Sequence, residues 1–233
     1  MAPGDASQKE AAVRAVRVVD LSRTIGPETQ PYPGDDPPVL EEAATLAEHG
    51  YTSTRVHMGS HSGTHADAPF HFLADGARLE ELPLELFVCP AVVVDATGRP
   101  DRSPITSADL EPWVPRLAPG TAVLVRTGWA AHYGTDRYFD HPYLDGSAAR
   151  LLTAAGVRTV GVDTPSPDPT RRAGDPEPDW AAHLAVLGAG GTIVENLCRL
   201  EDVDFPDPLF CALPIRLAGG DGAPVRAVAV RTG

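Results

Sequence analysis

The sequence has few cysteines, a single lysine and no long apolar run. Cys89, Cys198 and Cys211 form no C-x-x-C pair, and an odd number of cysteines does not indicate a disulfide framework. We interpret them as small apolar residues in a reducing compartment, with a nucleophilic cysteine as the alternative. No apolar run approaches the ~18 residues of a membrane span, and the first residues lack the apolar segment of a signal peptide. These absences predict a cytoplasmic protein that does not bind membranes.

Basic charge is also scarce. The 19 basic residues are Lys9 and otherwise arginine, against 32 acidic residues, which gives a formal net charge of −13. A field of that sign repels phosphate backbones and anionic lipid. Nucleic acid and membrane surfaces are therefore poor partners, and a small-molecule substrate is the better expectation.

Length and composition fit one globular domain. The 233 residues are 42% hydrophobic and 22% charged, which is ordinary for a folded chain. A domain size of roughly 150 residues favours one large domain over two. The small polar residues at the start predict a loose N-terminal lead over residues 1–14, followed by a single domain over residues 15–233.

Apolar runs bounded by glycine and proline predict more strands than helices. The expected helices cover residues 107–113 with Ser107 as the N-cap, 145–155 with Gly156 as the stop, and 179–187. The expected strands cover residues 15–21, 52–59, 89–95, 122–126, 159–163, 192–196, 210–217 and 225–230, the last two joined by the turn AGGDGAP. Interleaved elements predict an α/β fold with a mixed sheet, either open or curled toward a barrel. The loop-like stretch 163–179 is long enough to belong to a site.

One segment, SHSGTHADAPFHF, concentrates groups that bind metals or move protons. It places His61, His65, Asp67 and His71 within eleven positions. Gly63 and the proline at position 69 disfavour the helix on which two histidines four apart would share a face, so a tight loop fits better. Two imidazoles and a carboxylate form a facial set that leaves open positions on Zn²⁺, Mn²⁺ or Fe²⁺. A lone histidine would favour a surface residue without a ligand, but this spacing favours a metal site.

Two later residues are weaker candidates on their own. Glu195 lies in the apolar run TIVENL, and a carboxylate that faces a core needs a partner or a metal. His183, in DWAAHLAVL, is by itself better explained as a hydrogen-bonded helix residue. Asp163 and Ser166, in GVDTPSPDP, either contact substrate or a ligand, or cap a strand end; His141 is interpreted as structural.

HSGTHADAPFH resembles the H-x-G-T-H-x-D-x-P-x-H signature of the cyclase-like metal-dependent hydrolases, which include bacterial kynurenine formamidase and isatin hydrolase. Four further segments are similar to that family in the same order, and together they span nearly the whole chain: VVDLSRTIGPETQPYPGDDPP, GVDTPSPDP, HLAVLGAGGTIVENLCRL and LPIRLAGGDGAPVRAVAV. The resemblance implies a swivelling β/α/β fold around a partly barrel-like sheet. It also implies a homodimer or a homotetramer, with an aromatic or loop residue of one chain near the other's site.

The resemblance also implies residue roles. His61, His65 and Asp67 would bind a first ion, while Asp67, His183 and Glu195 would bind a second in members that hold two zinc ions. Similar members use a single manganese, so the metal is Zn²⁺ or Mn²⁺, in one or two copies. His71 would be the general acid/base. Tyr32 matches a position where relatives place an aromatic near the substrate, although loop packing explains it equally well.

The predicted function is metal-dependent hydrolysis of a small formamide, lactam or lactone, with metal-bound hydroxide as the nucleophile and His71 as the proton carrier. An N-formyl aromatic amine such as N-formylkynurenine, an intermediate of tryptophan catabolism, is the favoured substrate because of the family's best-known activity. Two alternatives remain. The same site could act as a cyclase or dehydratase of secondary metabolism, or the chain could be a non-catalytic metal or ligand binder. The complete ligand set together with His71 argues against the last.

Overall fold

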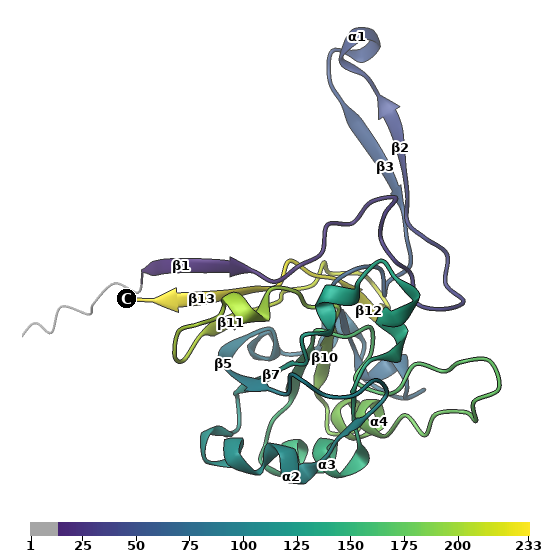
Figure 1. The fold of residues 1–233 in the computed structure, drawn as a ribbon. Coiled ribbons are helices and arrows are strands. Elements are labelled where there is room, and N and C mark those ends of the chain that lie inside the picture. The colour runs from purple at the N-terminus through teal and green to yellow at the C-terminus, as the bar shows by residue number, and fades with distance from the viewer. Residues whose placement is uncertain (1–13) are drawn as a thin grey trace, which may run out of the picture.

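The computed structural model describes residues 14–233. The predicted N-terminal lead lies outside these residues except for its last position. Within the described part, no helix combines the length and the apolar character needed to span a bilayer. The mixed α/β fold predicted from the sequence is confirmed, and its sheet curls partly toward a barrel (Figure 1).

A nine-stranded sheet organises the molecule, in the order β1-β13-β11-β5-β7-β9-β10-β4-β12. The four strands from β5 to β10 run parallel to one another, and every other neighbouring pair is antiparallel. The strands are β1 (Ala15–Asp20), β4 (His65–Asp67), β5 (Val88–Asp95), β7 (Ala122–Arg126), β9 (Thr159–Val162), β10 (Thr192–Glu195), β11 (Leu209–Cys211), β12 (Gly222–Pro224) and β13 (Val228–Thr232).

The central strands are buried on both faces, which explains their continuous apolar sequences. In β7, Leu124 packs into the core on one face of the sheet and Val123 into the core on the other. The second core includes side chains of α2 (Ser107–Leu110), α3 (Gly146–Ala154) and α4 (Ala181–Gly188), which cover that face of the sheet (Figure 1). A short parallel pair, β6 (Pro104–Ile105) and β8 (Tyr143–Leu144), adjoins these helices.

Helix starts depend on side-chain caps. Asp145 caps α3 by accepting hydrogen bonds from the N–H groups of residues 147 and 148. The prediction that Ser107 caps α2 is wrong by one position, because Thr106 and Asp109 form a capping box. The predicted helix continues after Leu110 only as a 3₁₀ turn. The 3₁₀ segments are η1 (Pro69–His71), η2 (Leu79–Glu81), η3 (Leu84–Leu86), η4 (Glu111–Arg116), η5 (Trp129–His132), η6 (Asp136–Asp140) and η7 (Leu200–Asp202).

Three further sequence predictions differ from the structure. The segment predicted as a tight loop contains the strand β4. With only three residues, this strand is too short to show an alternating apolar pattern in the sequence. Only residues 209–211 of the predicted strand 210–217 are extended in a sheet, and Pro214 makes an isolated bridge to Val225. Residues 222–224, expected within a turn, form β12 because they pair with β4.

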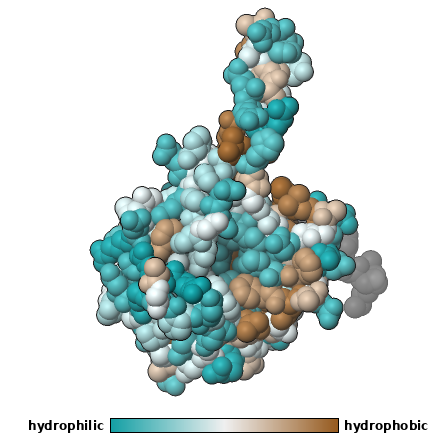
Figure 2. All heavy atoms as spheres, turned by 90° about the vertical axis from the view of Figure 1, so that its right-hand side faces the viewer, coloured by the Kyte–Doolittle hydropathy of each residue, from teal (hydrophilic) through white to brown (hydrophobic). Residues whose placement is uncertain are grey.

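A long hairpin projects from the body (Figure 1); its second strand lies within the predicted strand 52–59, whereas its first strand was not predicted. It consists of β2 (Val39–Ala44), the short helix α1 (Leu46–His49) and β3 (Ser53–His57). Leu40 and Val56 face each other across the two strands, and both are exposed. Apolar atoms also gather at the base of the hairpin and on a neighbouring face of the body (Figure 2).

Candidate active site

The strand β4 carries the centre of the site. It lies between β10 and β12, so that His65 pairs with Glu195 and Asp67 pairs with Ile193. Because side chains alternate along a strand, His65 and Asp67 point to one face while Ala66 packs into the apolar core on the other. The alternation places two donor groups from β4 beside the carboxylate of the neighbouring strand.

The turn before β4 requires glycine. Gly63 has a φ of +64°, and a Cβ atom there would lie 2.9 Å from the side chain of Ile25. Thr64 anchors the turn, since its hydroxyl accepts from the Arg23 N–H at 2.8 Å and donates to the Asn196 carbonyl at 2.9 Å. These bonds fix the direction in which the histidines leave the loop.

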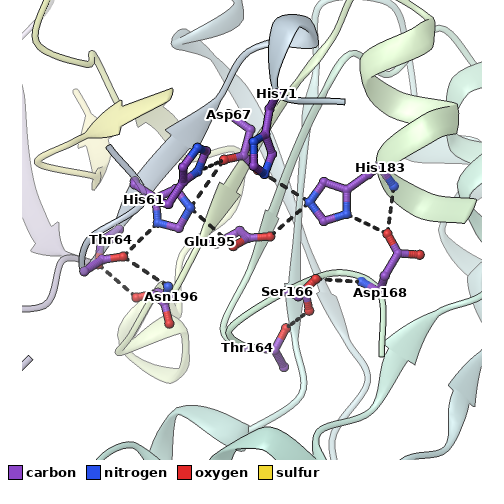
Figure 3. A network of polar contacts seen from close by, with 12 residues as sticks. His61, Thr64, Asp67, His71, Thr164, Ser166, Asp168, His183, Glu195 and Asn196 are labelled. Carbon is purple, nitrogen blue, oxygen red and sulfur yellow. Dashed lines mark hydrogen bonds and ion pairs between the residues drawn. The ribbon is translucent and has the colours of Figure 1, made fainter. Parts of the chain in front are cut away.

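The three residues of the first predicted ligand group lie together, and Figure 3 labels His61 and Asp67 among them. Nδ1 of His61 is 2.8 Å from Oδ1 of Asp67, and Nε2 of His65 is 3.3 Å from the same oxygen. Asp67 and His65 are almost fully buried. The structure brings these three side chains together.

His183 and Glu195 complete the cluster from α4 and β10. Nε2 of His183 lies 3.3 Å from Oε1 of Glu195 and 3.6 Å from Oδ2 of Asp67. Oε2 of Glu195 lies 3.3 Å from Nε2 of His65. Asp67 therefore lies between His61 and His65 on one side and His183 and Glu195 on the other.

Asp168, which the sequence analysis missed, holds His183 in position. Its carboxylate accepts a hydrogen bond from Nδ1 of His183 at 2.6 Å, and bonds from the N–H groups of Ala182 and His183 at 2.9 Å. The bond to Nδ1 directs Nε2 toward Asp67 and Glu195 (Figure 3). A carboxylate in a long loop shortly before a helix with a histidine in its first turn was the available signal.

Asp221 was also missed, because it lies in the predicted glycine-rich turn. Its Oδ2 lies 3.2 Å from Nε2 of His61 and 3.9 Å from Nδ1 of His71. The next residue, Gly222, leaves room for His61, since a Cβ atom there would lie 2.7 Å from the imidazole. Pairing of β12 with β4 brings Asp221 to the site.

Electrostatics in the cluster are set by carboxylates among imidazoles. Burial lowers the pKa of His65, but the carboxylates of Asp67 and Glu195 outweigh it and raise that pKa to about 10. Burial is likewise outweighed at His183, whose pKa is well above its ordinary value because of Asp168, Asp67 and Glu195. Burial raises the pKa of Asp67, yet the three histidines hold it well below the ordinary value. A divalent cation that binds here would therefore displace protons from His65 and His183.

The donor set fits a divalent metal ion. Among the described residues, Nε2 of His65 and Oδ2 of Asp67 are buried atoms without a hydrogen bond. One donor atom each from His65, Asp67 and Glu195 lie within 4.8 Å of one another, and so do one each from His61, Asp67 and His71. Imidazoles and carboxylates are the ligands that zinc and manganese accept.

His71 lies at the edge of the cluster. It follows Pro69 in the turn η1, and its ring stacks on that of His61 with centroids 4.0 Å apart. Its side chain is 31% exposed, and burial lowers its pKa, which keeps the imidazole neutral near pH 7. The position suits a residue that exchanges protons with a bound molecule, and it also lies within reach of a metal.

A cavity of about 280 Å³ opens over the donors. Both predicted substrate residues, Tyr32 and Ser166, line it. Ser166 also accepts a hydrogen bond from the N–H of Asp168 at 3.2 Å, so it supports the loop as well. Aromatic side chains form much of the wall: Tyr32, Phe72, Tyr138, Phe139 and Trp180.

Two further acidic and imidazole groups are structural. Asp163 accepts hydrogen bonds from the N–H groups of Thr127 and Gly128 and so holds the end of β7, although burial raises its pKa to about 6. His141 is bonded to the Pro142 carbonyl and the Thr170 hydroxyl, and burial lowers its pKa to about 4. The structural interpretation of His141 is confirmed.

Fold and donor set together define a metal-dependent hydrolase of the cyclase type. A family model described as "Putative cyclase" matches residues 19–169. The chain is 33% identical over 218 residues to a kynurenine formamidase of Bacillus cytotoxicus, covering 93% of this chain and 98% of that one. The chain belongs to the cyclase family.

Solved structures agree. Isatin hydrolase A from Labrenzia aggregata, solved with benzyl benzoate, superposes with a TM-score of 0.83 at 27% identity, covering 95% of this chain and 94% of that one. A predicted metal-dependent hydrolase from Bacillus stearothermophilus superposes with a TM-score of 0.74 at 28% identity, covering 94% and 99%. The two superpositions cover 95% and 94% of this chain.

Proposed function

We propose that this enzyme hydrolyses the C–N bond of a small aromatic formamide, with an N-formylkynurenine-like molecule as the favoured substrate and lactams or lactones as related ones. The observation that carries the proposal is a buried imidazole–carboxylate cluster beneath an aromatic cavity. Similarity to a kynurenine formamidase and to an isatin hydrolase supports the choice of an amide next to an aromatic ring.

His61, His65 and Asp67 would hold one ion, and His183 and Glu195 would share Asp67 to hold a second. Zinc or manganese fits these donors. A divalent ion in such a site supplies a nucleophile from water at neutral pH and polarises the substrate carbonyl. Asp168 fixes the tautomer of His183, and Asp221 contacts His61 from the solvent side.

His71 would move the proton. A neutral imidazole at the cavity edge can accept a proton as water attacks and return it to the leaving nitrogen. Because the aniline nitrogen of the substrate is a poor leaving group unless protonated, this transfer is worth about 10²–10⁴-fold in rate. Tyr32 and the other aromatic residues would hold the substrate ring by stacking and by excluding water.

The test uses metal-stripped protein. Stripping with a chelator should abolish formanilide hydrolysis, and added zinc or manganese should restore it in proportion to metal content. Products decide between reaction classes: hydrolysis releases formate and an aniline, whereas a cyclase or dehydratase gives a product that differs from its substrate only by water. Full activity in metal-free protein would overturn the proposal.

We also propose that the enzyme is a homodimer or homotetramer. The hairpin supports this, because Leu40 and Val56 lie on an arm whose strands are exposed along almost their whole length. Light scattering at micromolar concentration should give an oligomer. The double variant Leu40→Arg, Val56→Arg should shift it toward monomer, whereas Glu41→Gln on the opposite face of the hairpin should not; a monomeric parent protein would contradict the proposal.

A further inference from the structure

The cavity over the donor cluster is lined by acidic side chains and has no lysine or arginine among its described lining residues. Its imidazoles and Glu195 belong to the donor cluster. One remaining charged side chain, Asp35, faces the cavity, and none of the described basic residues forms an ion pair with it.

A tight turn places Asp35. The Asp35 N–H donates to the Tyr32 carbonyl at 3.0 Å, which closes a four-residue turn around Pro33 and Gly34. Gly34 has a φ of +106°, a conformation that proline followed by glycine favours. The turn returns the chain so that Asp35 and Tyr32 line the same cavity. The turn thus fixes the backbone of Asp35 at the rim of the cavity, and the side chain itself is exposed.

Asp35 also lies at a junction between two cavities. An outer cavity of about 610 Å³ shares Tyr32, Asp35 and His61 with the inner one. The outer wall includes Asp36 and His57, and the imidazole of His57 lies 3.8 Å from Glu41. A substituent that extends from a ring in the inner cavity toward the outer one therefore meets carboxylates.

We propose that the site selects aromatic formamides that carry a cationic substituent, and that Asp35 is the specificity-determining residue. This inference rests on the proposed hydrolysis of formamides. An ammonium group near Asp35 gains a partner, whereas a carboxylate at that same position meets like charge and finds no arginine or lysine among the residues that line the cavity. An N-formylkynurenine-like substrate carries both groups, and the inference places its ammonium, not its carboxylate, beside Asp35. The net charge of −13 acts in the same direction by attracting cations to the surface.

Three formanilides test the inference, each substituted at the same ring position with an aminomethyl, a hydroxymethyl or a carboxymethyl group. At low ionic strength, where charge interactions are least screened, kcat/KM should rank the cation first, the neutral compound second and the anion last. Asp35→Asn should lower the ratio of cation to neutral by about fivefold, the size expected of a partly exposed ion pair. Glu85→Gln removes the same charge at a position outside both cavities and should leave the ratio unchanged.

The outcomes separate the two proposals. If none of the three compounds is hydrolysed by metal-loaded enzyme, the formamidase function fails. If all are hydrolysed but the anion is equal to or better than the cation, the charge selection is wrong. If the cation is preferred and Asp35→Asn leaves that preference intact, another group reads the charge and the role of Asp35 is refuted.

Discussion

Replacing Asp168 by asparagine tests whether its carboxylate sets the tautomer of His183. In the parent protein the carboxylate can only accept, so Nδ1 of His183 must carry a proton, and Nε2 is the nitrogen whose proton a metal ion would displace. An asparagine can present its NH₂ group to Nδ1 instead. The proton then moves to Nε2, where it opposes a cation between Asp67 and Glu195.

The expected magnitudes follow from these contacts. Loss of a supporting partner of a metal-bound histidine typically lowers metal affinity by about 10–100-fold. The asparagine oxygen can still accept from one of the two N–H groups at the start of α4, so the fold should survive. A hydrogen bond to a charged group is worth about 1.5–3 kcal/mol, and the free energy of unfolding of the metal-free protein should fall by about that amount.

Competition with a chromophoric chelator measures the zinc affinity, and guanidinium unfolding of stripped protein measures stability. Asp175→Asn is the matched control, since Asp175 lies in the same loop but pairs with Arg102 at 2.6 Å. The control should retain the zinc affinity of the parent. If Asp168→Asn also binds zinc as tightly as the parent, the carboxylate does not set the tautomer of His183 and the reasoning is refuted.

Four further predictions concern the cluster itself. Asp67→Ala should be the most damaging ligand change, with loss of nearly all bound metal by elemental analysis; a variant that retains its metal would exclude a bridging role. His71→Ala should keep its metal while kcat falls by about 10²-fold or more, and parallel loss of metal and rate would instead make His71 a ligand. In stripped protein, the raised pKa of His65 contributes stability that is complete below pH 6.5 and lost as the pH rises to about 10, so Tm should fall across that window; added zinc should remove the decline. Gly222→Ala forces a Cβ atom to within 2.8 Å of the Ala66 carbonyl and 2.7 Å of His61, and should cost about 1–3 kcal/mol of stability together with metal affinity.

The sequence predicted the parts of the fold that depend on local patterns. Buried strands such as β7 have apolar side chains on both faces, and the helix that begins after Asp145 has a strong cap and a glycine stop. The first strand of the hairpin was missed because Val39–Ala44 carries two glutamates and little apolar periodicity. An exposed strand that pairs with only one other strand has a polar local sequence like that of an exposed loop, so the sequence alone does not distinguish the two.

The site was predicted as far as residue chemistry reached. His61, His65 and Asp67 are close in sequence, so their spacing alone was informative. Asp168 lies 15 positions before His183 and was overlooked in a long loop, whereas Asp221 lies 160 positions from His61. Such long-range partners follow from strand pairing, which a single sequence does not specify.

The three-residue strand β4 gives the protein a built-in check on its own assembly. His65 and Asp67 face the donors while Ala66 faces the apolar core, so a shift of one position against β10 would exchange these surroundings. The side chains of Asp67 and His65 would then enter the apolar core, and Ala66 would face the donor cluster in their place. A chain paired in the wrong register therefore cannot both close its interior and capture a metal. The metal-binding arrangement thus depends on the register in which His65 pairs with Glu195 and Asp67 pairs with Ile193.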